Sequence, residues 1–177
     1  SPIAGNVSLG EGTIMTENRD YTGTVTMTGT VTIDNTSRDI HIRMAHFRYD
    51  RLVLRTMNGG TGNVYIYVTG SFDGDKNNAD MDVDPLRMTP KIFFIYTGYT
   101  DATVRGNDWM AAYFYMPNSK VDLGGNPTVY GAMILGSFEF QGKSKIVFRK
   151  PEIEGTPFDD LGLFDRTVTV SNLTWLP

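Results

Sequence analysis

The chain has 177 residues, which is enough for one domain with a sizeable core. Its net charge of −4 and pI near 5.1 give no general attraction to nucleic acid or to anionic lipid. The lack of cysteine excludes a disulfide framework and a thiolate metal site. The sequence contains no run of about 18 apolar residues, so it predicts no membrane-spanning helix. We therefore expect one domain over residues 1–177, with no nucleic-acid partner.

The first seventy residues predict short strands and no helices. Residues 1–20 read as an N-terminal arm with one weak strand over residues 7–9. In residues 22–33 threonine occupies every even position, whereas Val25, Met27, Val31 and Ile33 alternate with it. A period of two places the apolar set inward and the hydroxyls outward. Further strands are predicted over residues 39–44, 51–56 and 63–69.

A repeat follows in the second half of the chain. Segments 91–98, 109–117 and 128–136 each end in a turn former, and these turn formers are evenly spaced: Gly98, Pro117 and Gly136. A second set of glycines follows the apolar strands: Gly106, Gly125 and Gly142. A period near twenty residues, with strands and turns in fixed phase, is typical of stacked coils that share one core. We expect an all-β parallel β-solenoid (β-helix) with coils of roughly 19 residues, in which strands near Tyr65, Phe93, Tyr113 and Tyr130 are parallel neighbours.

An acidic segment interrupts this repeat. Residues 64–70 resemble residues 92–98, yet the step from Gly70 to Gly98 is longer than the step between later coils, which predicts a loop insertion over residues 73–90. Within it, Asp73, Asp75 and Asn77 hold positions 1, 3 and 5 of a D-x-D-x-N spacing, and Asp84 holds position 12. Calcium requires several hard oxygen ligands of this kind, so calcium is the one cofactor that the sequence suggests. The alternative is a solvated acidic surface loop.

Aromatic residues suggest a second candidate site. Tyr113, Tyr115 and Tyr130 lie in the repeat strands, where outward rings would form a ligand stripe for sugars or for a protein strand. The alternative is that they pack within the fold. His41 and His46 are separated by an odd number of positions, so a regular strand would place them on opposite faces and they would not share a metal.

No catalytic residues are predicted. The chain has no G-x-S-x-G elbow, and the paired acids Glu152, Glu154, Asp159 and Asp160 fall in residues 151–177, which we expect to be a C-terminal cap. Paired carboxylates are the machinery of glycosidases, and polysaccharide-cleaving solenoids exist as a class. A carbohydrate-binding or carbohydrate-active β-helix is therefore the alternative to a protein that is not an enzyme.

The last coils resemble a bacterial surface domain. Residues 114–126 read FYMPNSKVDLGGN, and residues 129–136 and 138–142 read VYGAMILG and FEFQG. These are similar to the pattern Y-A-P-N-A-x-V-x-L-x-G-N-G-x-x-Y-G-A-I-x-G of a family that commonly follows a PilX-like type IV pilin N-terminal helix. The resemblance covers about residues 20–150. Met116 stands where the family has alanine, and the acidic insertion is a further departure.

This resemblance implies a right-handed solenoid that is extracellular, at the bacterial cell surface. The family has no assigned catalytic residues. We therefore expect a non-enzymatic structural or adhesive display domain, associated with the cell surface or a pilus. Its partners would be pilus or cell-surface proteins, with surface polysaccharide as a further candidate.

Overall fold

The computed structural model describes residues 1–74, 79–82 and 90–149, and in these ranges the chain is built from strands and turns. The strands are β1 (Val7–Leu9), β2 (Thr13–Met15), β3 (Arg19–Ile33), β4 (Ile40–Thr56), β5 (Val64–Gly74), β6 (Ala79–Met81), β7 (Ile92–Tyr96), β8 (Ala102–Gly106), β9 (Trp109–Gly125), β10 (Thr128–Phe140) and β11 (Lys145–Phe148). The described part holds no helix long and apolar enough to cross a membrane.

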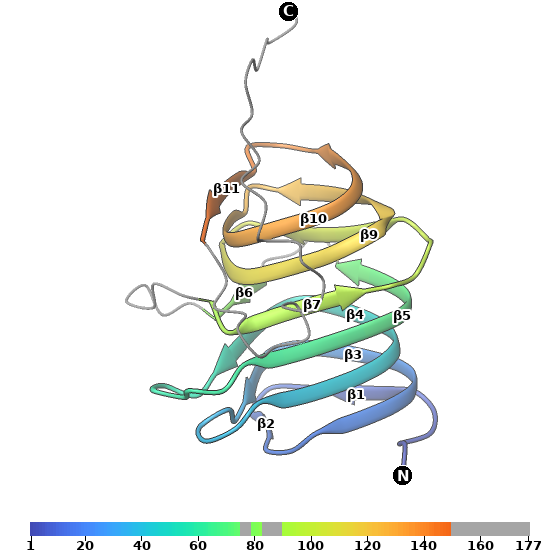
Figure 1. Ribbon diagram of the computed structural model, residues 1–177, viewed down its shortest axis with the longest axis vertical. Helices are drawn as coiled ribbons and strands as arrows, with labels where there is room; N and C mark the ends of the chain where they lie inside the picture. The colour runs from blue at the N-terminus through green and yellow to red at the C-terminus, as the bar shows by residue number, and fades with distance from the viewer. Residues whose placement is uncertain (75–78, 83–89, 150–177) are drawn as a thin grey trace, which may run out of the picture.

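These strands stack into a parallel β-solenoid of about five turns, with β1 at one end and β11 at the other (Figure 1). Every strand pairing within the described ranges is parallel. Tyr65 pairs with Phe93, Phe93 with Tyr113, and Tyr113 with Ala132. The predicted parallel neighbours are therefore confirmed.

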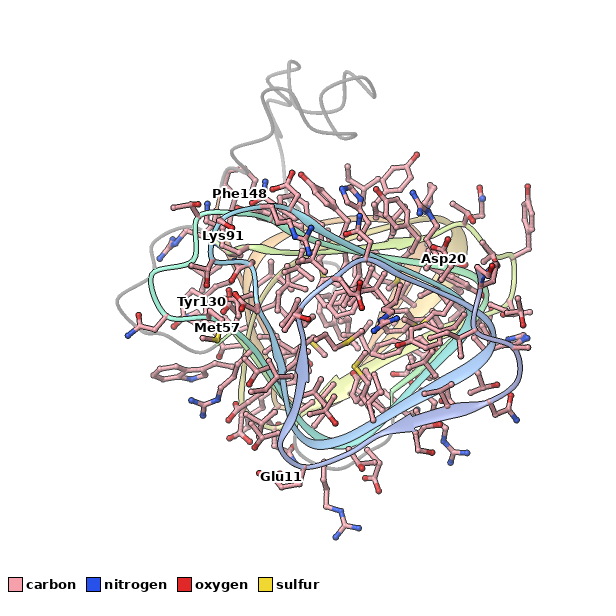
Figure 2. The ribbon with its side chains drawn as sticks, turned by 90° about the horizontal axis from the view of Figure 1, so that it is seen from below. Glu11, Asp20, Met57, Lys91, Tyr130 and Phe148 are labelled. Carbon is pink, nitrogen blue, oxygen red and sulfur yellow. The ribbon has the colours of Figure 1, made fainter. Side chains whose placement is uncertain are left out.

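Each turn of the solenoid has three faces, and the long strand β4 runs along all three of them. Residues 40–44 form the first face, residues 46–50 the second and residues 52–56 the third, and the strand pairing is irregular where one face passes into the next. Arg51 has a left-handed backbone at the second of these corners, with φ of 46°. Seen along the solenoid axis, the ribbon encloses an interior filled by side chains (Figure 2).

One predicted set of glycines marks a corner. Gly106 pairs with Gly125, and both end the second face of their coil. Gly125 and Gly142 have φ of 87° and 88°, a conformation that residues with a Cβ rarely adopt. A Cβ at Gly125 would also clash with the Gly106 carbonyl oxygen of the coil below. Glycine is required here both by the bend and by the close stacking of coils.

The number of residues per coil varies more than the even spacing of Gly98, Pro117 and Gly136 predicts. In the second half of the chain Trp109 pairs with Thr128 and Ile92 with Ala112, so the step between coils differs slightly from one pair to the next. The earlier coils are longer, since Ile40 pairs with Val64 and Val64 with Ile92. The extra residues lie in connections between faces, where a solenoid tolerates them.

Part of the expected insertion belongs to the wall. Asp73 and Gly74 end β5, and Ala79–Met81 form β6, which pairs with β4 and β9. The region 73–90 is therefore not a surface loop throughout. Residues 75–78 and 83–89 lie outside the described ranges, as does the expected C-terminal cap over residues 151–177.

Inward side chains form columns that run from coil to coil. One column consists of Ile42, Ile66, Phe94 and Phe114, all of which are buried. The rings of Phe94 and Phe114 stack with centroids 5.1 Å apart. In β3 the alternation is as predicted, because Val25, Met27, Val31 and Ile33 are fully buried. Stacking of like residues in register therefore builds one continuous core.

A buried tyrosine ties two separate coils together. The Tyr49 hydroxyl donates a hydrogen bond to the Arg105 carbonyl oxygen and accepts one from the Arg105 backbone N–H, both at 2.9 Å. Its partner residue in the intervening coil is Gly74, where any Cβ would clash with the Tyr49 hydroxyl. Burial raises the pKa of Tyr49 far above its ordinary value, so the hydroxyl stays neutral and remains a donor.

We predict that Tyr49→Phe lowers the free energy of unfolding by about 1–3 kcal/mol, because it leaves the Arg105 N–H and C=O without their buried partner. Urea unfolding measures the loss. Tyr99→Phe is the matched control, since the Tyr99 side chain is 83% exposed. Equal stability of both variants would contradict the structural role of the Tyr49 hydroxyl.

The core is open at its C-terminal end in the described structure. Phe138 and Phe140 pair with the buried Val121 and Leu123 and thus face inward, yet they are 58% and 47% exposed. Ile146 and Phe148 of β11 are also exposed. The alternation of Phe138 with Glu139 in the sequence predicts an inward, buried Phe138. The inward direction is confirmed, whereas the burial is not, because no described coil stacks beyond it.

We predict that Leu123→Asp destabilises the domain by several kcal/mol, whereas Phe138→Asp costs much less. Leu123 is 1% exposed, so an aspartate there is an uncompensated buried charge. The carboxylate at position 138 keeps much of its hydration. Thermal and urea unfolding of the two variants measure the difference, and losses of equal size would show that the last coil is closed.

Candidate functional site: the outside of the first face

Outward side chains on the first face line up in two columns. The first outward column is formed by His41, Tyr65, Phe93, Tyr113 and Ala132. The second outward column is formed by Asp20, Arg43, Tyr67, Ile95, Tyr115 and Ile134. The columns are neighbours along each strand, because alternate side chains of a strand share a face. Together they form a largely aromatic surface over six strands, β3, β4, β5, β7, β9 and β10.

The first outward column is an aromatic ladder. Ring centroids are 4.9 Å apart for His41 and Tyr65, 5.1 Å for Tyr65 and Phe93, and 4.8 Å for Phe93 and Tyr113. These spacings match the separation of neighbouring strands, about 4.8 Å. Parallel pairing in register therefore sets the stacking distance, and each ring contacts the next over several coils.

The ladder is buried although it points away from the core. The exposed fraction is 0% for Tyr65, 1% for Phe93 and 1% for Tyr113, whereas Tyr67 and Tyr115 of the second outward column are half-buried. A stacking platform for a sugar requires an open ring face. Tyr113 thus lies where the sequence places the ligand stripe, but its ring is covered.

Tyr130, the third residue of the predicted stripe, lies beside these columns. Its partner residue on β9 is Ala111, and its neighbours on β10, Val129 and Gly131, belong to inward columns. The Tyr130 ring meets Trp109 edge to face with centroids 6.2 Å apart, and the Arg149 guanidinium lies 5.6 Å from its centroid. Tyr130 therefore extends the aromatic surface toward the third face.

The N-terminal end of the two columns is polar. Arg43 forms an ion pair with Asp20 at 3.2 Å, and its guanidinium lies 5.3 Å from the centre of the Tyr67 ring. The Nδ1 atom of His41 is 3.3 Å from the Tyr67 hydroxyl. The pKa of His41 is lowered mainly by burial and secondly by the charge of Arg43. The pKa of Tyr67 is raised by burial. Both groups are therefore held in their neutral forms.

The calcium prediction falls mostly outside the described ranges. Asp75, Asn77 and Asp84 lie there, and Asp73 is in β5, where its carboxylate accepts a hydrogen bond of 3.0 Å from the Thr103 hydroxyl. In the described part of the chain, no three His, Asp or Glu residues are grouped closely enough to hold a metal ion. Calcium binding stays a prediction.

Sequence reasoning missed that His41, Tyr65 and Phe93 share the column of Tyr113. The sequence carries the signal, because the similarity of residues 64–70 to residues 92–98 places Tyr65 opposite Phe93, as the register of β5 and β7 does. The expectation that His41 and His46 point to opposite sides is wrong. The pairing shifts between Met44 and His46, which changes the alternation, so His46 also points outward and its Nδ1 lies 2.9 Å from the Ser71 hydroxyl oxygen.

Parallel coils around one core, with an aromatic ladder outside, define the chain as a β-solenoid domain. A family model described as a domain of unknown function (DUF7305) matches residues 4–152, and the chain belongs to this family. Comparisons with curated proteins and with solved structures found no match.

We predict that His41 makes the stability of the domain depend on pH. Its folded pKa lies below the unfolded value near 6.5, so the unfolded chain takes up the proton first as pH falls. Stability should be full above about pH 7 and decline as pH falls below about 6.5. His41→Phe should reduce the difference in unfolding free energy between pH 7.5 and 5.5, with both proteins also compared at pH 8. An unchanged difference would contradict the role of His41.

Proposed function

We propose that this domain is the non-enzymatic display domain of a bacterial cell-surface or pilus-associated protein. The observation that carries the proposal is the continuous parallel ladder from β1 to β11, which holds three outer faces in fixed positions. Such a scaffold presents side chains and connecting loops without needing a conformational change. Its role would be adhesion or assembly, through contacts with pilus or surface proteins.

The resemblance to surface domains behind PilX-like pilin helices supports the cellular context. The motif residues that carry it occupy structural positions, since Gly125 and Gly142 form the corner described above and Gly131 lies in an inward column. A Cβ at Gly131 would clash with the Ala112 carbonyl oxygen of the coil below. The shared motif thus describes how coils stack and supports a shared scaffold.

The test is the location of the natural protein in a bacterium that carries its gene. We expect an epitope inserted beside the exposed Tyr99 to be accessible to antibody on intact cells and to appear in the sheared pilus fraction. Deletion of the gene should lower the number of pili or attachment to surfaces. Recovery of the tagged protein only inside intact cells, together with a cytoplasmic marker, would refute the proposal.

Carbohydrate binding is the second candidate, and the second outward column favours it. Tyr67 and Tyr115 are half-buried, and Arg43 with Asp20 supplies polar groups at one end of the column. Partly exposed rings with adjacent charged groups are a usual combination for sugar contacts. If this candidate holds, a polysaccharide panel should reveal a ligand whose affinity falls at least tenfold in Tyr67→Ala or Tyr115→Ala and is unchanged in Tyr99→Ala.

A further inference from the structure

A hollow of about 280 Å³ lies on the outside of the second face, next to the corner where that face ends. It is lined by Arg105 of β8, by Gly124 and Gly125 of β9, and by Gln141, which directly follows β10. Arg105 alternates with the buried Val104, so its side chain points away from the core. The hollow therefore belongs to the outer surface and is separate from the aromatic columns of the first face.

The small size of Gly124 makes room for this hollow. Arg105 pairs with Gly124 in the neighbouring coil, and a Cβ at Gly124 would lie 2.9 Å from both Cγ and Nε of Arg105. Gly125 has a left-handed backbone, whereas Gly124 does not, so the bend of the chain does not require glycine at position 124. Glycine at this position instead lets the Arg105 side chain lie against β9.

Arg105 is held at both ends. Its backbone N–H and carbonyl oxygen are hydrogen-bonded to the buried Tyr49 hydroxyl. At the other end, Nη2 of Arg105 donates a hydrogen bond to Oδ2 of Asp122 within an ion pair. Nε2 of Gln141 donates to the same carboxylate oxygen at 3.4 Å. A guanidinium fixed in this way is preorganised, so contact with a ligand costs little side-chain entropy.

The guanidinium keeps an unused hydrogen-bond donor beside the hollow. Nη2 is occupied by Asp122, whereas the buried Nε of Arg105 has no hydrogen-bond partner. A buried donor without an acceptor is unfavourable, and such a group in a native protein calls for an explanation. Nε lies over Gly124, which lines the hollow. A ligand oxygen placed there supplies the acceptor that the described residues do not.

The balance of charge favours a neutral ligand. Asp122 neutralises Arg105, and on the same face Lys120 and Glu139 form their own ion pair at 2.7 Å. An anion would compete with Asp122 for the guanidinium, and a cation would be repelled by it. Hydroxyl groups both donate and accept, and so does the carboxamide of Gln141. The volume is close to the lower limit of small-molecule sites, about 300 Å³, which suits one ring-sized unit.

We propose that this hollow binds one neutral sugar residue of a saccharide chain. A hydroxyl oxygen of the sugar accepts a hydrogen bond from the Arg105 guanidinium, and a neighbouring hydroxyl exchanges hydrogen bonds with the Gln141 carboxamide. Asp122 positions the guanidinium and does not touch the sugar. The proposal goes beyond the display function and does not depend on it, and it concerns a different face from Tyr67 and Tyr115.

Nuclear magnetic resonance of the nitrogen-15-labelled full chain tests the proposal. The protein is titrated separately with D-mannose, D-galactose, N-acetyl-D-glucosamine and the acidic sugar D-glucuronate. At least one of the neutral sugars should shift the backbone amide signals of Gly124 and Gly125 in a saturable way, and D-glucuronate should bind more weakly than that sugar. The proposal is overturned if no neutral sugar gives a saturable shift at these glycines, or if D-glucuronate binds more tightly than all three.

Variants of the full chain locate the sugar. Arg105→Lys keeps the charge but removes the planar fork, and it should weaken binding of the sugar at least tenfold. Gln141→Ala, at an exposed position, should weaken it several-fold without lowering the melting temperature. Glu139→Gln is the matched control on the same face, outside the lining of the hollow, and should leave the affinity unchanged. Unchanged affinity in both Arg105→Lys and Gln141→Ala would refute the site, and a loss in Tyr67→Ala alone would place the sugar on the first face instead.

Discussion

The parallel backbone ladder, held in register from coil to coil, is the constraint on which the rest of this structure depends. It fixes which side chains meet, because each residue stacks on its partner in the next coil. On the first face, the register that stacks Phe94 on Phe114 inside the core also stacks Phe93 on Tyr113 outside it. A slip of one residue would exchange the two faces, so core and outer surface cannot change independently.

Corners and buried polar groups make this ladder possible. A close-packed coil must turn without separating from its neighbours, which requires the left-handed glycines at positions 125 and 142. Buried polar side chains then link coils: the Asn35 amide donates to the Gly62 carbonyl oxygen at 2.7 Å and accepts from the Met57 N–H at 3.0 Å. The Tyr49 hydroxyl makes a comparable link to the Arg105 backbone, across the intervening coil at Gly74. These side chains supply hydrogen-bond partners to backbone groups at and near the turns.

The sequence predicts local direction well and irregularities poorly. Alternation in residues 22–33 identifies the inward set because a strand has a strict period of two. The repeated glycines identify a corner because they recur once per coil at a position where the backbone needs a left-handed conformation. Alternation fails at the shift between Met44 and His46, where one residue changes the phase for His46. Burial of Tyr113 and exposure of Phe138 depend on what lies above each residue, which no local pattern encodes.

The outward ladder poses an energetic problem that the choice of residues makes unavoidable. Tyr, Phe and Tyr in one column are each large enough to bury about 150–250 Å², so an uncovered ladder would approach the largest apolar patches found on monomeric proteins. In the folded domain Tyr65, Phe93 and Tyr113 are almost fully buried, so their apolar surface is removed from water. On the second and third faces, by contrast, the outward positions of β3 are occupied by small threonine side chains, which form no comparable apolar surface.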